Sequence, residues 1–445
     1  LIFSYIQASN QTAQRFFSYN RDNKNILIEQ LNSLLNYVIK LASFFLLICL
    51  LILSIYFFLS FDYELFLEIL IPIILITFFT FFQVIGIPFV SLFSSLEKFK
   101  HFSISVGFDN TIKLLGAYST SLVLEEKYKL LICSLVLFFG SILSFALKNY
   151  MSNLLKVKFN YRTLKKTNLS KKMKSFTFFS ALGLISKNIN DYGNNFLINN
   201  FFNSIFVSFR AVSSQLFNFL NQFLGTIFLL YKSDITYNYS QKNYLKTNDL
   251  IVISSKIIFF LGVMIVFPIY INMDLVINLW LSETNEDLIF FSKLGLLASL
   301  LLALHHPLTA FVHASGNIKM YSIITESIIF FSFPLTFILY SLNFDVVYVF
   351  YVTIFCFILA HLLRIYHCNL TGLFQLKPYL KSFLIPTTLI FLFLFFIWPI
   401  KFEGILTYEN KFLKIIMDSI LLIPIFLIIF FRDISVYLKT YKSYN

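Results

Sequence analysis

The stretch LASFFLLICLLILSIYFFLS, residues 41–60, decides the fold of this chain. It carries no charge, and it has the length of about 20 apolar residues that a helix needs to cross a hydrocarbon core. Residues 1–19 resemble the tail of a further span. We expect the true beginning of the chain, with its first helix, to be missing. We predict twelve complete spans, at 36–60, 65–93, 102–124, 130–148, 174–200, 205–231, 250–272, 288–315, 320–342, 346–366, 380–400 and 412–431.

The composition of the whole chain agrees with this prediction. Hydrophobic residues make up 58% of the 445 residues, charged residues make up 13%, and the mean hydropathy is +0.78. Soluble domains carry about 25% charged residues, and a single soluble core stops growing near ~250–300 residues. The excess apolar surface must therefore face lipid, which predicts an all-α polytopic membrane protein.

Lysine and arginine are concentrated in alternate loops, most densely from Lys148 to Lys174 around the longest loop, 149–173, and Arg364 is counted in the same set. The loops in between carry acids instead, such as Asp62, Asp274 and Glu286. Basic loops remain in the cytoplasm, so this pattern places loop 149–173 and the C-terminus there. The net charge of +13 then reflects topology and contact with anionic lipid headgroups. No nucleic acid is needed as a partner to explain it.

The same loop divides the chain. Five visible spans, counting the partial one, precede it, six follow it, and two more complete the chain. Transporters built from repeated lobes bind substrate between the lobes, and we expect two six-helix lobes here. We predict an N-terminal helical lobe at 1–148, a basic cytoplasmic linker at 149–173, a C-terminal helical lobe at 174–366, and an extra helix pair with a cytoplasmic tail at 367–445.

Two pairs of opposite charges lie inside predicted spans, where a charge is costly and usually functional. Asp109 and Lys113 are four residues apart, as are Lys187 and Asp191, so each pair falls on one face of its helix. Two interpretations stay open. Each pair either neutralises itself within its own helix, or both pairs line a water-filled cavity.

A polar stretch surrounds the second pair. Asn194 and Asn195 follow Asp191, and the next span carries Arg210 and Gln215. Unpaired polar groups cannot face lipid, so we expect this stretch to face the protein interior, where its amides suit a hydroxyl-rich glycan. Arg210 could extend to the membrane surface, bind phosphate through its bidentate fork, or form a structural pair. The sequence leaves these three roles open.

Other chemistry is not indicated. The four cysteines stand singly, and the adjacent His305 and His306 turn to different sides of a helix, so we expect neither a disulfide framework nor a metal site. The sequence has no Walker-A glycine loop for ATP, and no loop is long enough for a catalytic domain. We therefore expect no cofactor, no metal and no enzymatic activity.

Four segments resemble a known family. They are QTAQRFFSYNRDNKN (11–25), IPFVSLFSSLEKFKHFS (87–103), PLTAFVHASGNIKMYSI (307–323) and FPLTFILYSLNF (333–344). They are similar to the Gln-Arg-Phe segment, the Ile-Pro to Glu-Lys loop, the Gly-Asn-Ile-Lys turn and the Leu-Pro helix of Wzx-like flippases. These flippases act in O-antigen and polysaccharide biosynthesis. They belong to the multidrug/oligosaccharidyl-lipid/polysaccharide (MOP) exporter superfamily.

The resemblance implies two MATE-like helical lobes around a cationic cavity, with alternating access. It implies a lipid-linked oligosaccharide as the substrate: an O-antigen or capsule repeat unit on undecaprenyl pyrophosphate. That unit would move from the cytoplasmic to the periplasmic leaflet of a bacterial inner membrane, among membrane lipids and beside glycan polymerase or assembly proteins. No catalytic residue is implied. The cavity candidates are Arg210, Lys187, Asp191, Lys113, Asp109, Arg15, Asn194, Asn195 and Gln215.

Two alternatives remain. A MATE-type multidrug exporter would need a buried acid for coupling, and Asp109 or Asp191 could serve; each has a lysine one turn away that favours its charged form. A membrane-embedded glycan polymerase or ligase would need reactive residues in a periplasmic loop. The longest loop predicted on that side, 272–288, has no Arg or His.

Overall fold

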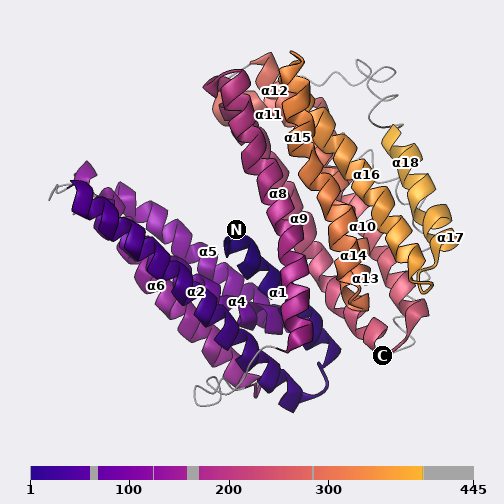
Figure 1. The fold of residues 1–445 in the computed structure, drawn as a ribbon, viewed down its shortest axis with the longest axis horizontal. Helices are drawn as coiled ribbons and strands as arrows, with labels where there is room; N and C mark the ends of the chain where they lie inside the picture. Colours follow the sequence, from indigo (N-terminus) through magenta and orange to yellow (C-terminus); the bar gives the residue numbers. More distant parts are fainter. Residues whose placement is uncertain are drawn as a thin grey trace. The chain divides into compact units, whose positions relative to one another are not determined.

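In a computed structural model, the described residues form α-helices with short π-helical segments and no strands. This confirms the predicted all-α class. The chain divides into two compact units, Leu1–Leu184 and Ile185–Asn445 (Figure 1). The predicted span 412–431, part of the span 380–400, residues 65–68 of the span 65–93 and residues 158–169 of the linker lie outside the description. The residues that the structure describes are 2–60, 69–123, 125–157, 170–282, 285–392 and 394.

The first unit is built around α4, which packs against α1, α2 and α6, while α5 packs against α6. Leu27, Leu31 and Leu34 recur at helical spacing on α2 and are buried with Phe89 of α4. Further along α2, Phe44, Leu47, Leu51, Ile52 and Ile55 are exposed, as expected of a surface that faces lipid. The helices are α1 (Ile2–Tyr19), α2 (Lys24–Ser60), α4 (Ile71–Ser95), α5 (Phe99–Ser121), α6 (Glu126–Leu154) and the first part of α8 (Lys171–Phe201).

The second unit begins within α8 and continues with α9 (Ser204–Ser240), which packs along α12, α10 and α13. Asn203 caps α9 by accepting hydrogen bonds from two backbone N–H groups of its first turn. The other elements are α10 (Tyr244–Ile271), α11 (Met273–Leu281), α12 (Glu286–Ala303), α13 (His305–Ser315), α14 (Ile318–Tyr321), the π-helix η2 (Ser322–Glu326), α15 (Ser327–Ser341), α16 (Tyr348–Leu370), α17 (Leu376–Tyr379), the π-helix η3 (Leu380–Leu384) and α18 (Ile385–Leu392).

The predicted spans correspond to helices wherever they are described, with three corrections. The span 288–315 is two helices, α12 and α13, which meet at Leu304. The span 320–342 contains the π-helical segment η2, and the span 380–400 begins with the π-helical segment η3. By length and composition alone, seven described stretches could cross a membrane. They are Lys24–Ile55, Ile71–Ser95, Glu126–Leu154, Tyr244–Ile271, Glu286–Ser315, Ile318–Ser341 and Tyr348–Leu370.

The predicted spans at 102–124, 174–200 and 205–231 form α5, α8 and α9 but are not among these seven. The polar residues considered for function lower their hydropathy.

The boundary between the compact units lies inside α8, at Leu184 and Ile185. Because 158–169 are outside the description, the linker at 149–173 and the lobe limits stay predictions.

Candidate functional site

Asp109 of α5 is the centre of a polar network in the first unit. Its Oδ2 lies 2.7 Å from the Nζ of Lys148 on α6. Its Oδ1 accepts hydrogen bonds from Ser144 of α6 and from Gln83 of α4, the latter at 3.1 Å. Three helices therefore meet at one carboxylate, and every oxygen of that carboxylate has a partner.

This network corrects two sequence interpretations. The predicted partner of Asp109 was Lys113, but Lys113 is exposed, and the ion pair is made across helices with Lys148. Lys148 had been counted among the basic residues of the cytoplasmic loop, yet its side chain is only 2% exposed. The spacing rule found a possible pair, but the packing of α5 against α6 provided a closer cation.

Gly86 of α4 makes room for the Lys148 side chain. A methyl group at position 86 would lie 3.1 Å from both Cδ and Nζ of Lys148, which is closer than ordinary contact. The glycine thus lets the aliphatic stem of Lys148 lie along α4 while its amine reaches Asp109.

Arg15, a weaker candidate on α1, lies among aromatic rings. Its guanidinium carbon is 5.0 Å from the ring centroids of Phe16, Tyr19 and Phe176. Such faces stabilise a cation by about 0.5–2 kcal/mol. In this conformation the aromatic cluster is the environment of Arg15, so its role as a substrate ligand stays a prediction.

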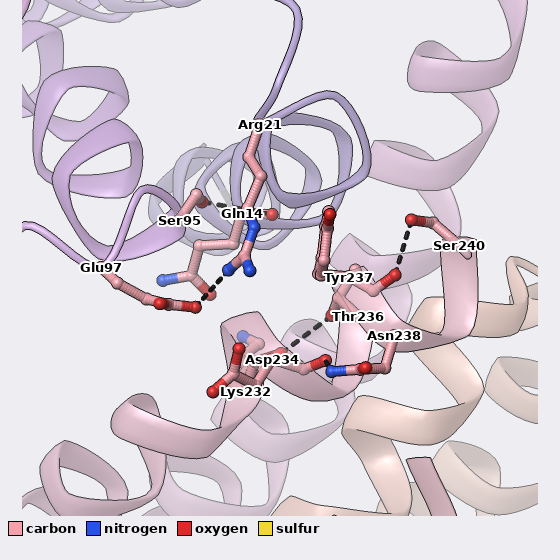
Figure 2. Close-up of polar contacts among 10 residues, drawn as sticks. All are labelled: Gln14, Arg21, Ser95, Glu97, Lys232, Asp234, Thr236, Tyr237, Asn238 and Ser240. Carbon is pink, nitrogen blue, oxygen red and sulfur yellow. Dashed lines mark hydrogen bonds and ion pairs between the residues drawn. The ribbon is translucent and has the colours of Figure 1, made fainter. Parts of the chain in front are cut away.

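Figure 2 shows the polar contacts at two helix ends, one in each unit. In the first unit, Arg21 pairs with Glu97, and the Ser95 hydroxyl donates to the backbone oxygen of Gln14 at 3.2 Å. In the second, Asn238 near the end of α9 donates to the backbone oxygen of Asp234 at 2.8 Å. The Arg21–Glu97 pair joins two loops predicted to be cytoplasmic.

Arg210 of α9 is buried, with 7% of its surface exposed. Its Nη1 donates to the backbone oxygen of Asp191 at 3.0 Å and to Oδ1 of Asn195 at 2.7 Å, both on α8. In this conformation the side chain is bonded to α8, and which of its three roles it has stays a prediction. The guanidinium joins α8 to α9, and a role in phosphate binding would require this contact to open.

Asp191 and Lys187 lie on the same helix, α8, as predicted, but Asp191 also interacts with a cation on another helix. Asp191 interacts electrostatically with both Lys187 and Arg210. The Lys187 Nζ lies 6.0 Å from the ring centroid of Phe217 on α9, and the residue is half-buried. The carboxylate is thus shared between two cations, and Lys187 is the more accessible of the two.

The predicted polar stretch splits into buried and exposed residues. Asn194 is fully buried and donates to Oδ1 of Asn190 at 2.7 Å, and Asn190 also accepts from the Ser332 hydroxyl on α15. The Oδ1 of Asn194 has no hydrogen-bond partner among the described residues. Gln215 is exposed. The asparagines therefore connect α8 to α15, while Gln215 lies on another surface of α9.

Sequence reasoning missed a second buried ion pair, in α16. Arg364 had been counted as a cytoplasmic loop residue, but it is 3% exposed. Its Nη2 lies 2.9 Å from Oε1 of Glu326, and its Nε donates to the Tyr321 hydroxyl at 2.8 Å. Arg364 stands near the end of the predicted span 346–366, next to a basic loop, so the sequence placed its charge on the cytoplasmic side.

No protein-family profile matches the chain, and no curated protein matches it. Solved structures do. An outward-facing multidrug resistance MATE family transporter of the MOP superfamily aligns with a TM-score of 0.65 and 11% identity over 84% of this chain and 85% of its own. A MOP superfamily transporter from Pyrococcus furiosus, described as having a binding pocket of reversed polarity, gives 0.65 and 11% over 85% of each chain.

A third solved structure is the lipid II flippase MurJ in an inward closed conformation. It aligns with a TM-score of 0.57 and 18% identity, over 97% of this chain and 91% of its own. At these identities the likeness establishes the fold. The chain has the polytopic helical fold of MATE-like membrane transporters, as the sequence predicted.

Proposed function

We propose that this chain is a flippase that moves an undecaprenyl-pyrophosphate-linked oligosaccharide, an O-antigen or capsule repeat unit, from the cytoplasmic to the periplasmic leaflet. It acts by alternating access between two helical lobes in a bacterial inner membrane. Membrane lipids and the glycan-assembly proteins that consume the flipped unit are its partners.

One observation carries this proposal: the share of this chain that aligns with each solved structure. The flippase alignment covers 97% of this chain, whereas the MATE alignment covers 84%. The MATE alignment leaves a larger part of this chain unmatched. A near-complete alignment with a lipid flippase supports a lipid-linked cargo over the cargo of a multidrug transporter.

The charges of the second unit support an anionic cargo. Lys187 is half-buried beside an aromatic ring, and its strongly hydrated amine suits a phosphate oxygen. Arg210 fixes α8 through Asp191 and Asn195 and so positions Lys187. We assign phosphate binding to Lys187 and the positioning of α8 to Arg210.

A multidrug exporter is the second candidate, because the MATE alignment has the higher TM-score, 0.65 against 0.57. Such an exporter would need a carboxylate able to exchange a cation. Asp109 is occupied by Lys148, and Asp191 interacts with two cations. Because both acids are already paired with cations of the protein, neither fits the coupling role that an exporter needs, and this favours the flippase.

Reconstitution can separate the two candidates. The purified chain is placed in proteoliposomes with a fluorescent undecaprenyl-pyrophosphate oligosaccharide, and a membrane-impermeant lectin or quencher reports on movement between leaflets. A parallel sample is loaded with the cationic dye ethidium. We expect protein-dependent movement of the lipid-linked glycan and none of ethidium; transport of ethidium with a stationary glycan would overturn the proposal.

The residue assignment has its own test. Lys187→Gln should lower glycan movement about tenfold, which corresponds to the loss of about 1.4 kcal/mol of phosphate interaction, with an unchanged melting temperature. Lys319→Gln is the matched control, because this lysine is exposed at the start of α14, and we expect it to transport normally. Equal activity of both variants would remove Lys187 from the site.

A further inference from the structure

Helix α9 carries an exposed polar stripe that the proposed phosphate site does not use. This α9 stripe consists of Gln215, Asn218, Gln222 and Thr226, which are all exposed. They recur at intervals of three or four residues, so they lie along one face of the helix, inside the predicted span 205–231. A polar face at this depth cannot lie against hydrocarbon, because lipid offers it no hydrogen-bond partner. The α9 stripe therefore needs water or a polar ligand beside it.

The amide side chains of α9 divide into bonded and unbonded ones. Asn221 donates to the backbone oxygen of Phe217 and to the hydroxyl of Ser299 on α12, both at 3.1 Å. By contrast, the amides of Asn218 and Gln222, on the neighbouring face, have no hydrogen-bond partner within the described part of the chain. Asn221 thus joins two helices, whereas the amides of the α9 stripe are available to a ligand.

Two aromatic rings border the α9 stripe. Phe219 and Phe223 are 64% and 40% exposed, and their spacing of four residues places them in a row. Gln215 and Gln222 stand four residues before and three residues after Phe219, so both amides are its neighbours on the helix surface. A sugar ring has apolar C–H groups on its faces and hydroxyls around its edge. Aromatic faces attract such C–H groups, and amides both donate to and accept from hydroxyls.

The α9 stripe is also electrically neutral. From Ala211 to Tyr231 the helix has no Asp, Glu, Lys or Arg. The preceding Arg210 is bonded to Asp191 and Asn195 of α8. Such a face gives neither a phosphate nor an organic cation an ion pair, whereas a neutral sugar requires none. The charge of this surface therefore matches an uncharged, hydroxyl-rich ligand.

This neutral face adjoins the proposed phosphate site. The Nζ of Lys187 on α8 lies 6.0 Å from the ring centroid of Phe217, and Asn218 of the α9 stripe directly follows Phe217. Eleven residues separate Gln215 from Thr226, so the α9 stripe is about 16 Å long. A cargo whose phosphate is bound at Lys187 has this length of amide and aromatic surface beside it for its sugars.

We propose that the α9 stripe, together with Phe219 and Phe223, binds the neutral sugars of the lipid-linked cargo. This inference rests on the proposed function and gives the sugars a subsite separate from that of the phosphate. The amides exchange hydrogen bonds with sugar hydroxyls, and the two rings pack against the C–H faces. Because the surface has no charge, it selects uncharged sugars at these positions.

Movement of the fluorescent undecaprenyl-pyrophosphate oligosaccharide in proteoliposomes tests the sugar subsite. Asn218→Leu/Gln222→Leu replaces two exposed amides with a good helix former, so the melting temperature should not change. We expect movement to slow by about tenfold or more, because a site built to bond hydroxyls recognises its ligand poorly without those bonds. Gln241→Leu is the control, since this exposed glutamine lies at the C-terminal end of α9, beyond the predicted span. It should transport like the parent.

This experiment separates the subsite from the proposed function. A parent chain that moves the glycan, with a double variant that moves it equally fast, overturns the sugar subsite and leaves the flippase intact. A parent chain that moves no glycan contradicts the flippase itself. In that case, or if the double variant does not fold, a binding measurement decides on the subsite.

The binding measurement is labelling of Asn218→Cys by a membrane-impermeant maleimide, on protein in nanodiscs. The oligosaccharide released from the same lipid probe should slow the labelling, whereas inorganic pyrophosphate should not. The parent chain, with its four cysteines, gives the background. An unreactive Asn218→Cys would mean that lipid or protein covers the α9 stripe, and this overturns the proposal. Labelling that the oligosaccharide does not slow, or that pyrophosphate slows equally, overturns it too.

Discussion

The two buried ion pairs, one in each compact unit, differ in how completely they are bonded. In the first unit, Asp109 receives hydrogen bonds from Lys148, Ser144 and Gln83, which join α4, α5 and α6. In the second, Arg364 holds Glu326 and Tyr321, but its Nη1 has no partner among the described residues. Buried charges are stable when every lone pair and proton is satisfied. The first pair therefore locks its helices, whereas the second can exchange partners.

The largest effect should come from breaking the saturated pair. Lys148→Met removes the cation and leaves a buried carboxylate without its partner, which costs about 3–5 kcal/mol. We expect a marked fall in the melting temperature of the detergent-purified protein. Asp109→Asn/Lys148→Met should recover much of this loss because no buried charge then remains.

Lys113→Met is the control for this experiment, since Lys113 is exposed on the same helix as Asp109. Its melting temperature should equal that of the parent protein. A normal melting temperature for Lys148→Met, or a Lys113→Met variant as unstable as Lys148→Met, would contradict the cross-helix pairing.

An intermediate effect is expected where helices approach most closely. A methyl group at Gly295 of α12 would lie 2.1 Å from the Ser213 hydroxyl and 3.2 Å from the backbone oxygen of Ser213, on α9. That hydroxyl donates to the backbone oxygen of Phe291 at 2.8 Å. Gly295→Ala should therefore push the two helices apart and cost about 1–3 kcal/mol.

Gly140→Ala in the first unit gives the matching comparison. Its methyl group would lie 2.4 Å from Cγ2 of Ile112, a side chain that can turn without moving backbone. We expect a smaller loss of melting temperature than for Gly295→Ala. The reverse order would mean that the helices of the first unit are packed more rigidly than those of the second.

The smallest effect should come from Arg210→Lys. Lysine keeps the charge near Asp191, but its amine stands on a shorter side chain than the Nη1 that reaches both Asp191 and Asn195, so we expect it to lose one of the two hydrogen bonds. Loss of one hydrogen bond to a charged group costs about 1.5 kcal/mol. The melting temperature should fall modestly, while Gln215→Ala, exposed on the same helix, should not change it.

This variant also bears on the site. If Arg210 positions α8, glycan movement by Arg210→Lys should fall only in proportion to the amount of folded protein. A well-folded variant without transport would instead return Arg210 to direct phosphate binding.

Much of the fold could be predicted because burial in lipid imposes simple rules on sequence. The span 130–148 lies within α6 and the span 250–272 almost coincides with α10, since long apolar runs have few alternatives to helix. The break at Leu304 and the π-helical segment η2 were not predicted. Apolarity sets the length of a hydrophobic stretch but does not fix the local hydrogen-bond pattern that interrupts it.

The candidate site was predicted less well, for a related reason. The i,i+4 rule considers one helix at a time, so it joined Asp109 to Lys113 and could not find Lys148 on α6. The charge asymmetry of the loops placed Arg364 on the cytoplasmic side, and its partner Glu326 lies 38 residues away in the sequence. Partners on different helices are contacts of tertiary structure and leave no spacing in the sequence.

The sequence by itself determined that this chain is helical and apolar, because composition and hydropathy act residue by residue. It also located the polar segment from Lys187 to Arg210. Only the tertiary structure decided which charges meet, since the choice between Lys113 and Lys148 depends on how α5 packs against α6. The stacked pair His305 and His361 arises in the same way, from two helices whose contact no local pattern predicts.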